Sequence, residues 1–283
     1  MTAQFVRRTC VNTVSLPFLS ARKLPIRSVG RALLPGVVAV LVAVTNGAPE
    51  GQTQSSPPAS GSPMDAAIAL LDQTRSALRR VDDYDCTQLS RERVNGKLLP
   101  EQTMYTRARR EPFGVYLRFE APDTVRGQEA CFVEGRNRGM MRIHPAGWRG
   151  IIGFVSIDTR DPRVFQESRH PITEAGLWSV MDATARYWEM ERRVDKTTVH
   201  IEDRTFLERP CTWIETIHPD RSAARYYAYR CVLCVDKATH LPVRIEAYDW
   251  PRSNGPAGGE LLECYTYLNF RTNRGFTSAA FDY

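Results

Sequence analysis

Residues 225–281 read RYYAYRCVLCVDKATHLPVRIEAYDWPRSNGPAGGELLECYTYLNFRTNRGFTSAAF, and this stretch decides the fold class. Alternation of apolar and polar residues with a period of two predicts three strands in it. These are Tyr226–Val235, Leu241–Asp249 and Glu260–Phe270. The first and third strands are apolar on both faces, so each face must be covered by a core or by a ligand.

The middle strand alternates cleanly. Its predicted apolar face holds Leu241, Val243, Ile245 and Ala247. Arg244 and Glu246 share the other face, and we expect them to pair with Glu263 on the neighbouring strand. Such a solvated ion pair contributes roughly 0–1 kcal/mol.

The chain upstream of these strands begins with an amphipathic helix. Ser62 is the expected N-cap, Pro63 fits the first helical position, and Asp65 has the spacing of a capping box. Its apolar stripe recurs every three or four residues, at Ile68, Leu71, Leu78 and Val81. An amphipathic helix of this kind is expected to cover one face of a sheet.

From residue 84 onward the period changes to two, which predicts consecutive antiparallel strands. The strands expected before the last three are Tyr84–Val94, Leu99–Arg110, Phe113–Glu120, Gln128–Glu134, Gly139–His144, Ile151–Ile157, Thr197–Phe206 and Cys211–His218. Asn95-Gly96 between the first two is a hairpin signal, because both residues tolerate positive φ. The prediction is a mainly antiparallel α+β fold: a curled, incomplete β-barrel of about eleven strands with two helices packed on it.

The second helix is predicted over Thr173–Arg192, with Thr173 as its cap. It either packs as an ordinary core helix or roofs an apolar pocket, and the sequence leaves both open. If a pocket remains, its candidate lining comes from this helix and from the first strand quoted above. These residues are Leu177, Trp178, Met181, Trp188, Tyr227 and Tyr229.

Residues 1–48 have the parts of an export signal. Six basic residues and no acidic ones precede or flank the apolar run Ala32–Val44, which at thirteen residues is short for a bilayer span of about 20. We expect a cleaved signal peptide, with an uncleaved N-terminal anchor as the alternative. A Pro/Ser/Gly-rich linker, 49–63, and a single domain, 64–283, follow. The predicted location is the periplasm or cell envelope.

Composition limits the partners. The chain has 38 Lys and Arg against 32 Asp and Glu, but six of the basic residues lie in the leader, so the charges of the remainder balance. The basic pI therefore gives no support to nucleic-acid binding. Six of the seven cysteines follow the leader. Cys231 and Cys234 should not bridge, because residues i and i+3 of a strand face opposite sides, and Cys264 is the expected partner if either forms a disulfide.

Catalytic motifs are missing from the sequence. It contains no G-x-S-x-G, H-E-x-x-H, P-loop or G-x-G-x-x-G pattern, and its five histidines are scattered. His170 and Glu174 have i,i+4 spacing, but Pro171 places His170 before the helix. We therefore predict no catalytic residue, no metal site and no cofactor.

Several segments resemble a bacterial family of exported proteins, domain of unknown function 1571. They are RERVNGKLLPEQTMYTRARREPFGVYLRFEAP (91–122), RHPITEAG (169–176), ERPCTWIETIHP (208–219), HLPVRIEAYDWP (240–251) and ECYTYLNFRTNRGFTSAAFD (263–282). More distantly, the order of elements resembles the LolA/LppX-like lipoprotein-carrier fold, an incomplete barrel whose helices close a hydrophobic cavity.

That resemblance implies an envelope protein that binds a lipid, an acyl chain or a lipoprotein on an apolar concave face. It transfers no catalytic residue. The alternative is an envelope interaction or sensor module without a transported ligand, with an envelope protein as partner, and an enzyme is the third class. Peripheral or N-terminal membrane association is compatible with each of these readings.

Overall fold

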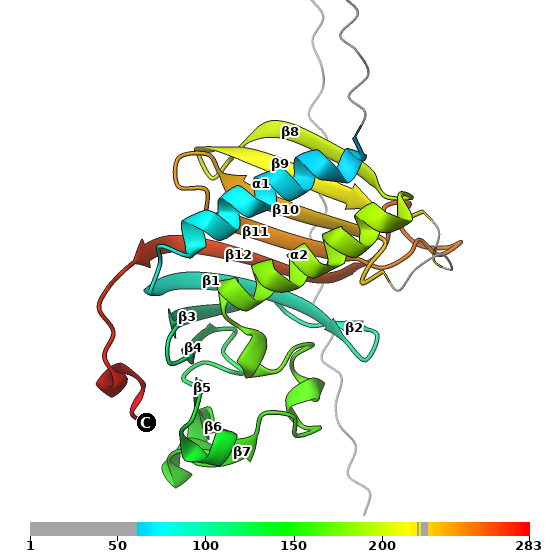
Figure 1. Ribbon diagram of the computed structural model, residues 1–283. Helices are drawn as coiled ribbons and strands as arrows, with labels where there is room; N and C mark the ends of the chain where they lie inside the picture. Colours follow the sequence, from blue (N-terminus) through cyan, green and yellow to red (C-terminus); the bar gives the residue numbers. More distant parts are fainter. Residues whose placement is uncertain (1–60, 220, 222–225) are drawn as a thin grey trace, which may run out of the picture. The chain divides into compact units, whose positions relative to one another are not determined.

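Antiparallel pairing of neighbouring strands builds one open sheet in the computed structural model of the protein (Figure 1), which describes residues 61–219, 221 and 226–283. The strands are β1 (Asp83–Val94), β2 (Lys97–Leu98), β3 (Gln102–Arg109), β4 (Gly114–Ala121), β5 (Glu129–Val133), β6 (Met140–His144), β7 (Val155–Asp158), β8 (Thr198–Phe206), β9 (Arg209–Ile217), β10 (Arg230–Asp236), β11 (Pro242–Tyr248) and β12 (Leu261–Thr272). Their order is β7-β6-β5-β4-β3-β1-β12-β11-β10-β9-β8, with β2 paired only to β1. The sheet does not close, which confirms the predicted fold class.

The centre of the sheet joins the two ends of the domain. β1 pairs with β3 on one side and with β12 on the other, and Glu92 lies opposite Glu263 in that second pairing. We call strands β3–β7 the first wing and strands β8–β12 the second wing. Each wing is a run of strands adjacent in sequence, so β1–β12 is the one long-range pairing that holds the wings together.

Helix α1 (Pro63–Leu78) forms as the sequence predicts. The Ser62 hydroxyl accepts a hydrogen bond from the backbone N–H of Met64 at 3.4 Å, Pro63 opens the helix and Asp65 lies in the first turn. These groups satisfy donors that a helix N-terminus leaves unpaired. α1 therefore starts where its capping residues place it.

Helix α2 (Leu177–Val194) starts four residues later than predicted. Thr173 lies instead in a short 3-10 turn, η4 (Ile172–Glu174), and extended Gly176 occupies the N-cap position. The prediction that Thr173 caps the helix was wrong. α2 ends at Asp195, which adopts the left-handed conformation. It carries the chain from edge strand β7 to edge strand β8, across one face of the sheet (Figure 1).

Both helices lie on the same face, which we call the helix face. They run antiparallel, since Trp178 of α2 donates from Nε1 to the carbonyl of Leu78 at 3.1 Å, and Arg192 contacts Asp65 at 3.4 Å. Their apolar stripes meet side chains of β1, β9, β10 and β12 in one cluster. Its buried members include Leu71, Leu78, Tyr84, Leu177, Met181, Trp188, Ile214, Leu233, Val235 and Tyr267.

The opposite face of the second wing is covered by arginines stacked on aromatic rings. The guanidinium of Arg230 lies 3.8 Å from the ring centre of Tyr248, and that of Arg204 lies 4.5 Å from the ring of Trp213. The long stems of such arginines shield apolar surface while their charges stay near water. This is how strands with two apolar faces are covered without a second layer of helices.

The first wing is covered by irregular segments. On the helix face, residues 159–176 bring Val164 and Ile172 onto a cluster that includes Val115, Phe132 and Met141. On the opposite face, residues 273–283 pack aromatic side chains on β4 and β5. Tyr283 stacks on Tyr116 at 4.4 Å, and Phe281 is buried in the same cluster.

The three strands of residues 225–281 form, with two differences. β10 starts at Arg230, so Tyr226–Tyr229 lie before the strand and not within it. A bulge at Val243 turns that side chain to the face opposite Ile245, against the predicted common face.

The register also places Glu263 beside Ala247, away from Arg244 and Glu246. Arg244 does pair with Glu246, but the expected contact with Glu263 was wrong.

Two predictions in the first half of the sheet sequence, before α2, also change. The strand expected over Ile151–Ile157 splits into a 3-10 helix, η2 (Gly147–Ile152), and the short β7. The expected count of eleven strands becomes twelve because Lys97–Leu98 forms β2, next to the predicted hairpin turn. Asn95 and Gly96 there have φ of 49° and 79°. The turn signal was read correctly.

The six cysteines of the described residues are free thiols. Cys234 is buried beside Cys211 on one face of β10, whereas Cys231 lies on the other face, as alternation predicts. Cys264 cannot be the partner of either, because β11 lies between β10 and β12. The expectation of a bridge to Cys264 was therefore wrong.

The predicted leader, 1–48, and nearly all of the predicted linker, 49–63, lie outside the described residues, so both stay predictions. No helix within 61–219 or 226–283 combines the length and apolar character that a bilayer span requires.

Candidate functional site

The apolar residues predicted on α2 reach the helix face of the sheet. Leu177, Met181 and Trp188 are all buried in the cluster between the helices and the sheet. The hydroxyl of Tyr84, on β1, accepts a hydrogen bond from the backbone N–H of Leu177 at 3.2 Å. β1 thereby fixes the first turn of α2, and three of the six predicted lining residues gather in one place.

Trp178 lies at the edge of this cluster. Its ring centre is 5.2 Å from that of Tyr84, and its indole N–H donates to the carbonyl of Leu78. The same carbonyl, at the end of α1, also accepts from the backbone N–H of Val81. Trp178 thus ties the two helices together where they cross β1.

The two predicted tyrosines do not join the apolar cluster. Tyr227 directs its hydroxyl into a group of charged side chains and donates to Glu263 Oε1 at 2.8 Å. Tyr229 uses its backbone to bond Tyr248, and its ring lies against Gly259. The structure therefore brings together four of the six predicted residues and places the tyrosines elsewhere.

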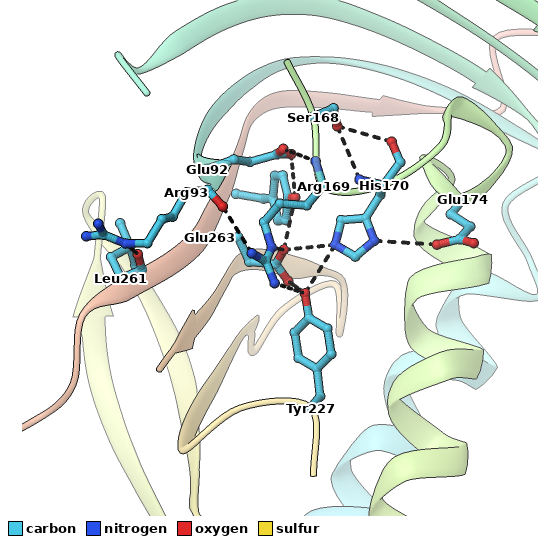
Figure 2. Close-up of polar contacts among 10 residues, drawn as sticks. Glu92, Arg93, Ser168, Arg169, His170, Glu174, Tyr227, Leu261 and Glu263 are labelled. Carbon is cyan, nitrogen blue, oxygen red and sulfur yellow. Dashed lines mark hydrogen bonds and ion pairs between the residues drawn. The ribbon is translucent and has the colours of Figure 1, made fainter. Parts of the chain in front are cut away.

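The charged group around Tyr227 links residues from several distant segments through polar contacts (Figure 2). It rests on two carboxylates, Glu92 of β1 and Glu263 of β12, which the strand register sets opposite one another. Both are buried, so their like charges require compensation. That compensation comes from the segment between β7 and α2.

Arg169 and His170 bring this compensation. The backbone N–H of Arg169 donates to Glu92 Oε2 at 2.6 Å, and its Nε donates to Glu263 Oε2 at 3.1 Å. The His170 Nε2 atom lies 2.8 Å from the same oxygen of Glu263. Tyr265 completes the group by donating its hydroxyl to Glu92 Oε1 at 2.6 Å. We call these residues, with Tyr227, the glutamate network.

Electrostatics within the network favour the charged forms of its members. Burial alone would raise the pKa of Glu263, but hydrogen bonds from His170 and Tyr227 and the charge of Arg169 bring that pKa below its usual value. Burial alone would lower the pKa of His170, but the hydrogen bond and charge of Glu263, with Glu92 and Glu174, raise it. Both shifts favour the ion pair between Glu263 and His170.

This arrangement holds a loop in place. His170 bridges Glu263 and Glu174, whose Oε2 lies 3.4 Å from Nδ1, so the i,i+4 spacing seen in the sequence corresponds to a contact. Within the described part of the chain, no serine or cysteine side chain hydrogen-bonds the imidazole, so no nucleophile is paired with it. No three His, Cys, Asp or Glu side chains there are placed to hold a metal ion.

A hollow of about 240 Å³ opens beside the apolar cluster, between α1 and strands β9 and β10. Leu70, Ile214 and Val235 form its apolar wall, and the last two are fully buried. Exposed Lys237 and His240 lie at its mouth. Lys237 forms an ion pair with Asp203, so the rim is polar and the wall is apolar. Such a hollow is suited to a ligand with an apolar tail and a polar head.

The fold and this site define a class: an open antiparallel sheet with two helices on one face and an apolar cluster between them. The sequence model of a protein family of unknown function, DUF1571, matches residues 81–283, and the chain belongs to this family. A comparison with curated proteins gives no match. The family predicted from the sequence is thus confirmed.

Solved structures with a similar arrangement come from several bacteria. The lipoprotein LppX of Mycobacterium tuberculosis shares 11% identity, with 75% of this chain and 98% of that chain covered and a TM-score of 0.43. A LolA superfamily protein of Nitrosomonas europaea shares 10% identity, with 77% and 97% covered and a TM-score of 0.31. MucB in the MucA/MucB complex of Pseudomonas aeruginosa shares 15% identity, with 77% and 61% covered and a TM-score of 0.41. These likenesses concern the fold alone.

The glutamate network is what sequence reasoning missed. Glu263, Tyr265 and Tyr267 are alternate residues of one strand and share a face, so a carboxylate lies on an otherwise aromatic strand face. Such a residue needs a buried cation, and the RHP triplet containing Arg169 and His170 was available to supply it. No periodicity indicates that the two segments meet, because 94 positions separate Arg169 from Glu263.

Proposed function

We propose that the protein binds an acyl chain of an envelope lipid or lipoprotein on the helix face of its sheet. The observation that carries this proposal is the hollow of about 240 Å³ between α1 and strands β9 and β10, which continues the apolar cluster. Burying an acyl chain gains about 0.8 kcal/mol per methylene, so even a short buried length contributes several kcal/mol.

Ligand sites usually measure about 300–1,000 Å³, and the hollow is smaller than this, so it holds only the end of an acyl chain. Deeper entry requires α1 and α2 to separate. Their polar contacts at the surface resist this weakly, since Arg75 and Asp182 form an exposed ion pair at 2.9 Å. Once the two helices have separated, the acyl chain would contact Leu177, Met181 and Trp188, with Trp178 beside them. Tyr227 and Tyr229 remain part of the proposed lining, at its polar end.

Export to the envelope belongs to this proposal. It rests on the basic segment and apolar run of residues 1–48, and N-terminal sequencing of the protein from its native host tests it. A chain that starts after Gly47 or Ala48 supports a cleaved signal. An intact leader in the cytosolic fraction would remove the envelope assignment.

Displacement of a fluorescent fatty acid from the delipidated protein tests binding. Leu70→Trp fills the hollow from a half-buried position on α1, and Ala69→Trp puts the same side chain on the exposed side of the same turn. We expect saturable binding by the wild type, at least about tenfold weaker binding by Leu70→Trp, corresponding to 1.4 kcal/mol, and no change in Ala69→Trp. The absence of saturable uptake by the wild type would overturn the proposal.

A second function, an interaction or sensor module without a transported ligand, is favoured by one observation. Leu177, Met181 and Trp188 already fill the space between α2 and the sheet. Native mass spectrometry of the protein purified from envelopes distinguishes the two functions. A mass increment of a lipid that solvent extraction removes supports the carrier, and a stoichiometric protein partner on a lipid-free chain supports the module.

A further inference from the structure

The connection between β6 and β7 exposes three large apolar side chains. Trp148, Ile151 and Ile152 are 76%, 90% and 69% exposed, and all three lie in η2. The other exposed large apolar residues of the described chain, such as Ile201 and Leu207, lie apart from one another. Three such side chains within five positions are a concentrated patch, which soluble surfaces rarely carry without a binding role.

The segment that contains this patch is rich in arginine. Residues 135–160 contain a single acidic residue, Asp158, and five arginines, whereas the charges of the chain beyond the leader balance. The arginines are Arg136, Arg138, Arg142, Arg149 and Arg160. Arg136 pairs with Asp282, and none of the other four forms an ion pair within the described residues. Arg149 lies within η2 and Arg142 lies on β6, the strand that leads into it, whereas Arg136, Arg138 and Arg160 lie at the other end of β6 and β7.

A second hollow, of about 470 Å³, adjoins the patch on the face opposite the helices. Arg142 lines it, and the buried Nε of this arginine has no hydrogen-bond partner. The guanidinium lies 5.7 Å from the ring centre of Phe154, two residues after η2, and Phe154 packs on Tyr283 of the hollow at 5.5 Å. Phe154 thus connects the hollow with the apolar patch. The carboxylate of Asp282 also lines the hollow, but it is paired with Arg136, so the guanidinium of Arg142 is left to interact with an anion.

We propose that this surface binds the face of an anionic membrane. Trp148, Ile151 and Ile152 enter the boundary between headgroups and acyl chains, where tryptophan is enriched in membrane proteins. Arg149 contacts lipid phosphates beside the apolar side chains, and Arg142 receives one headgroup phosphate in the hollow. A bilayer fits better than a protein groove, because the apolar side chains project from a short turn that also carries the positive charge of Arg149.

This surface is independent of the acyl-chain site. It belongs to the first wing, at the β6–β7 end of the sheet, whereas the hollow under α1 belongs to the second wing. A protein that fails to bind fatty acid can still bind vesicles through η2.

Depth-dependent quenching of tryptophan emission tests the proposal on the full chain. Vesicles of phosphatidylcholine alone, or mixed with phosphatidylglycerol, carry lipids brominated along the acyl chain. We expect quenching with the anionic vesicles, its reduction by added salt, and its loss in Trp148→Phe. The chain has five tryptophans, so the readout for residue 148 is the part of the quenching that Trp148→Phe removes. Attachment of the vesicle through the leader does not produce that difference.

Two further variants separate the apolar and the charged contributions. Replacing Ile151 and Ile152 together by serine should weaken vesicle binding about tenfold or more, because two exposed side chains lose their burial in lipid. The matched control replaces Ile201 and Leu207 by serine, on the β8–β9 hairpin at the other edge of the sheet, and should bind as the wild type does. Arg142→Gln should weaken binding about fivefold, and only to anionic vesicles.

Three outcomes would overturn the proposal. The first is equal quenching in Trp148→Phe and the wild type. The second is an equal loss of vesicle binding in the double variant of Ile151 and Ile152 and in its control. The third is the absence of a preference for anionic lipid. Sedimentation of the lipid-free chain tests whether a second copy of the protein covers η2 in place of a membrane. That is the conclusion if the wild type dimerises and if replacing Ile151 and Ile152 by serine abolishes dimerisation without affecting vesicle binding.

Discussion

The two wings of the sheet are built from similar strands but are covered differently. The second wing lies under two amphipathic helices, whose stripes bury Leu71, Leu177 and Trp188 in one apolar cluster. The first wing lies under a connecting segment on one face and the C-terminal residues 273–283 on the other. The helices bury a broad apolar surface with one small hollow beside α1, whereas the irregular segments leave a larger hollow, arginines without ion pairs and the exposed turn η2.

This difference gives the two wings different kinds of surface for binding. The helix-covered wing supplies the apolar cluster, and the loop-covered wing supplies the surface with Arg142 and Trp148. Arg107 illustrates the second style of covering, since its guanidinium donates to the carbonyl of Ala280 and lies 5.3 Å from the ring centre of Tyr116. A tail held by a few such contacts can adjust to a ligand more easily than a packed helix pair.

The largest expected effect on the free energy of unfolding comes from truncating a buried side chain in the helix-covered cluster. Leu177→Ala should lower the free energy of unfolding by about 2–5 kcal/mol, because a rigid helix cannot close the cavity. Met141→Ala, equally buried beneath the segment 159–176, should cost less, since that segment can collapse. Urea denaturation with unchanged m-values measures both. Equal costs would show that the wings do not differ in rigidity.

Removing one charge of the glutamate network should have the next largest effect. Glu263→Gln keeps the shape of the side chain and leaves Arg169 and His170 with less compensation. Because both are partly exposed, we expect a loss of about 1–3 kcal/mol in unfolding free energy, below the value for a fully buried pair. Glu260→Gln is the control: its contacts with Arg93 and Arg252 are long, at 3.8 and 3.9 Å, and the loss should stay within about 0.5 kcal/mol.

The network should also make stability depend on pH. The raised pKa of His170 means that its contribution is complete below about pH 6.5 and is lost as pH rises through the folded-state pKa. The lowered pKa of Glu263 means that its contribution is present above about pH 4.3 and is lost as pH falls through the folded-state pKa. Urea titrations across this range should show the alkaline loss in the wild type and a smaller one in His170→Gln. An identical profile in both proteins would contradict this assignment.

The smallest effect should come from the exposed turn. Trp148→Ser with Ile151→Ser removes side chains that touch little of the protein, so the free energy of unfolding should change by less than about 0.5 kcal/mol. Thermal unfolding of the variant beside the wild type measures this. A large destabilisation would mean that η2 is part of the core, and the contrast between the wings would then be weaker than the structure indicates.

Periodicity predicted most of the fold because most elements bury one face. The cap Ser62-Pro63, the Asn95-Gly96 turn and nearly every strand follow local rules that need no knowledge of neighbours. The failures occur where a neighbour decides. Val243 turns over at a bulge set by β10, Thr173 loses its capping role to Gly176, and Ile151 and Ile152 form an exposed turn although their apolar character predicts a strand.

The candidate site was predicted in part, for the same reason. The apolar residues of α2 could be identified because a helical stripe shows which side is buried. The glutamate network could not, since Glu92, Arg169 and Glu263 come from three distant segments and each looks like an ordinary surface charge alone. Tyr227 looked apolar in a strand pattern, yet its hydroxyl determines where it lies.

The pairing of β1 with β12 sets an order of assembly. As the chain is synthesised, β1 can pair at once with β3, but its other edge stays open until β12, which begins at Leu261, has been made. An open strand edge is a template for unwanted pairing, so the half-made protein is most vulnerable to aggregation late in its synthesis. A premature stop shortly before Leu261 would remove a middle strand, and with it the seam between the wings, although it shortens the chain only at its end.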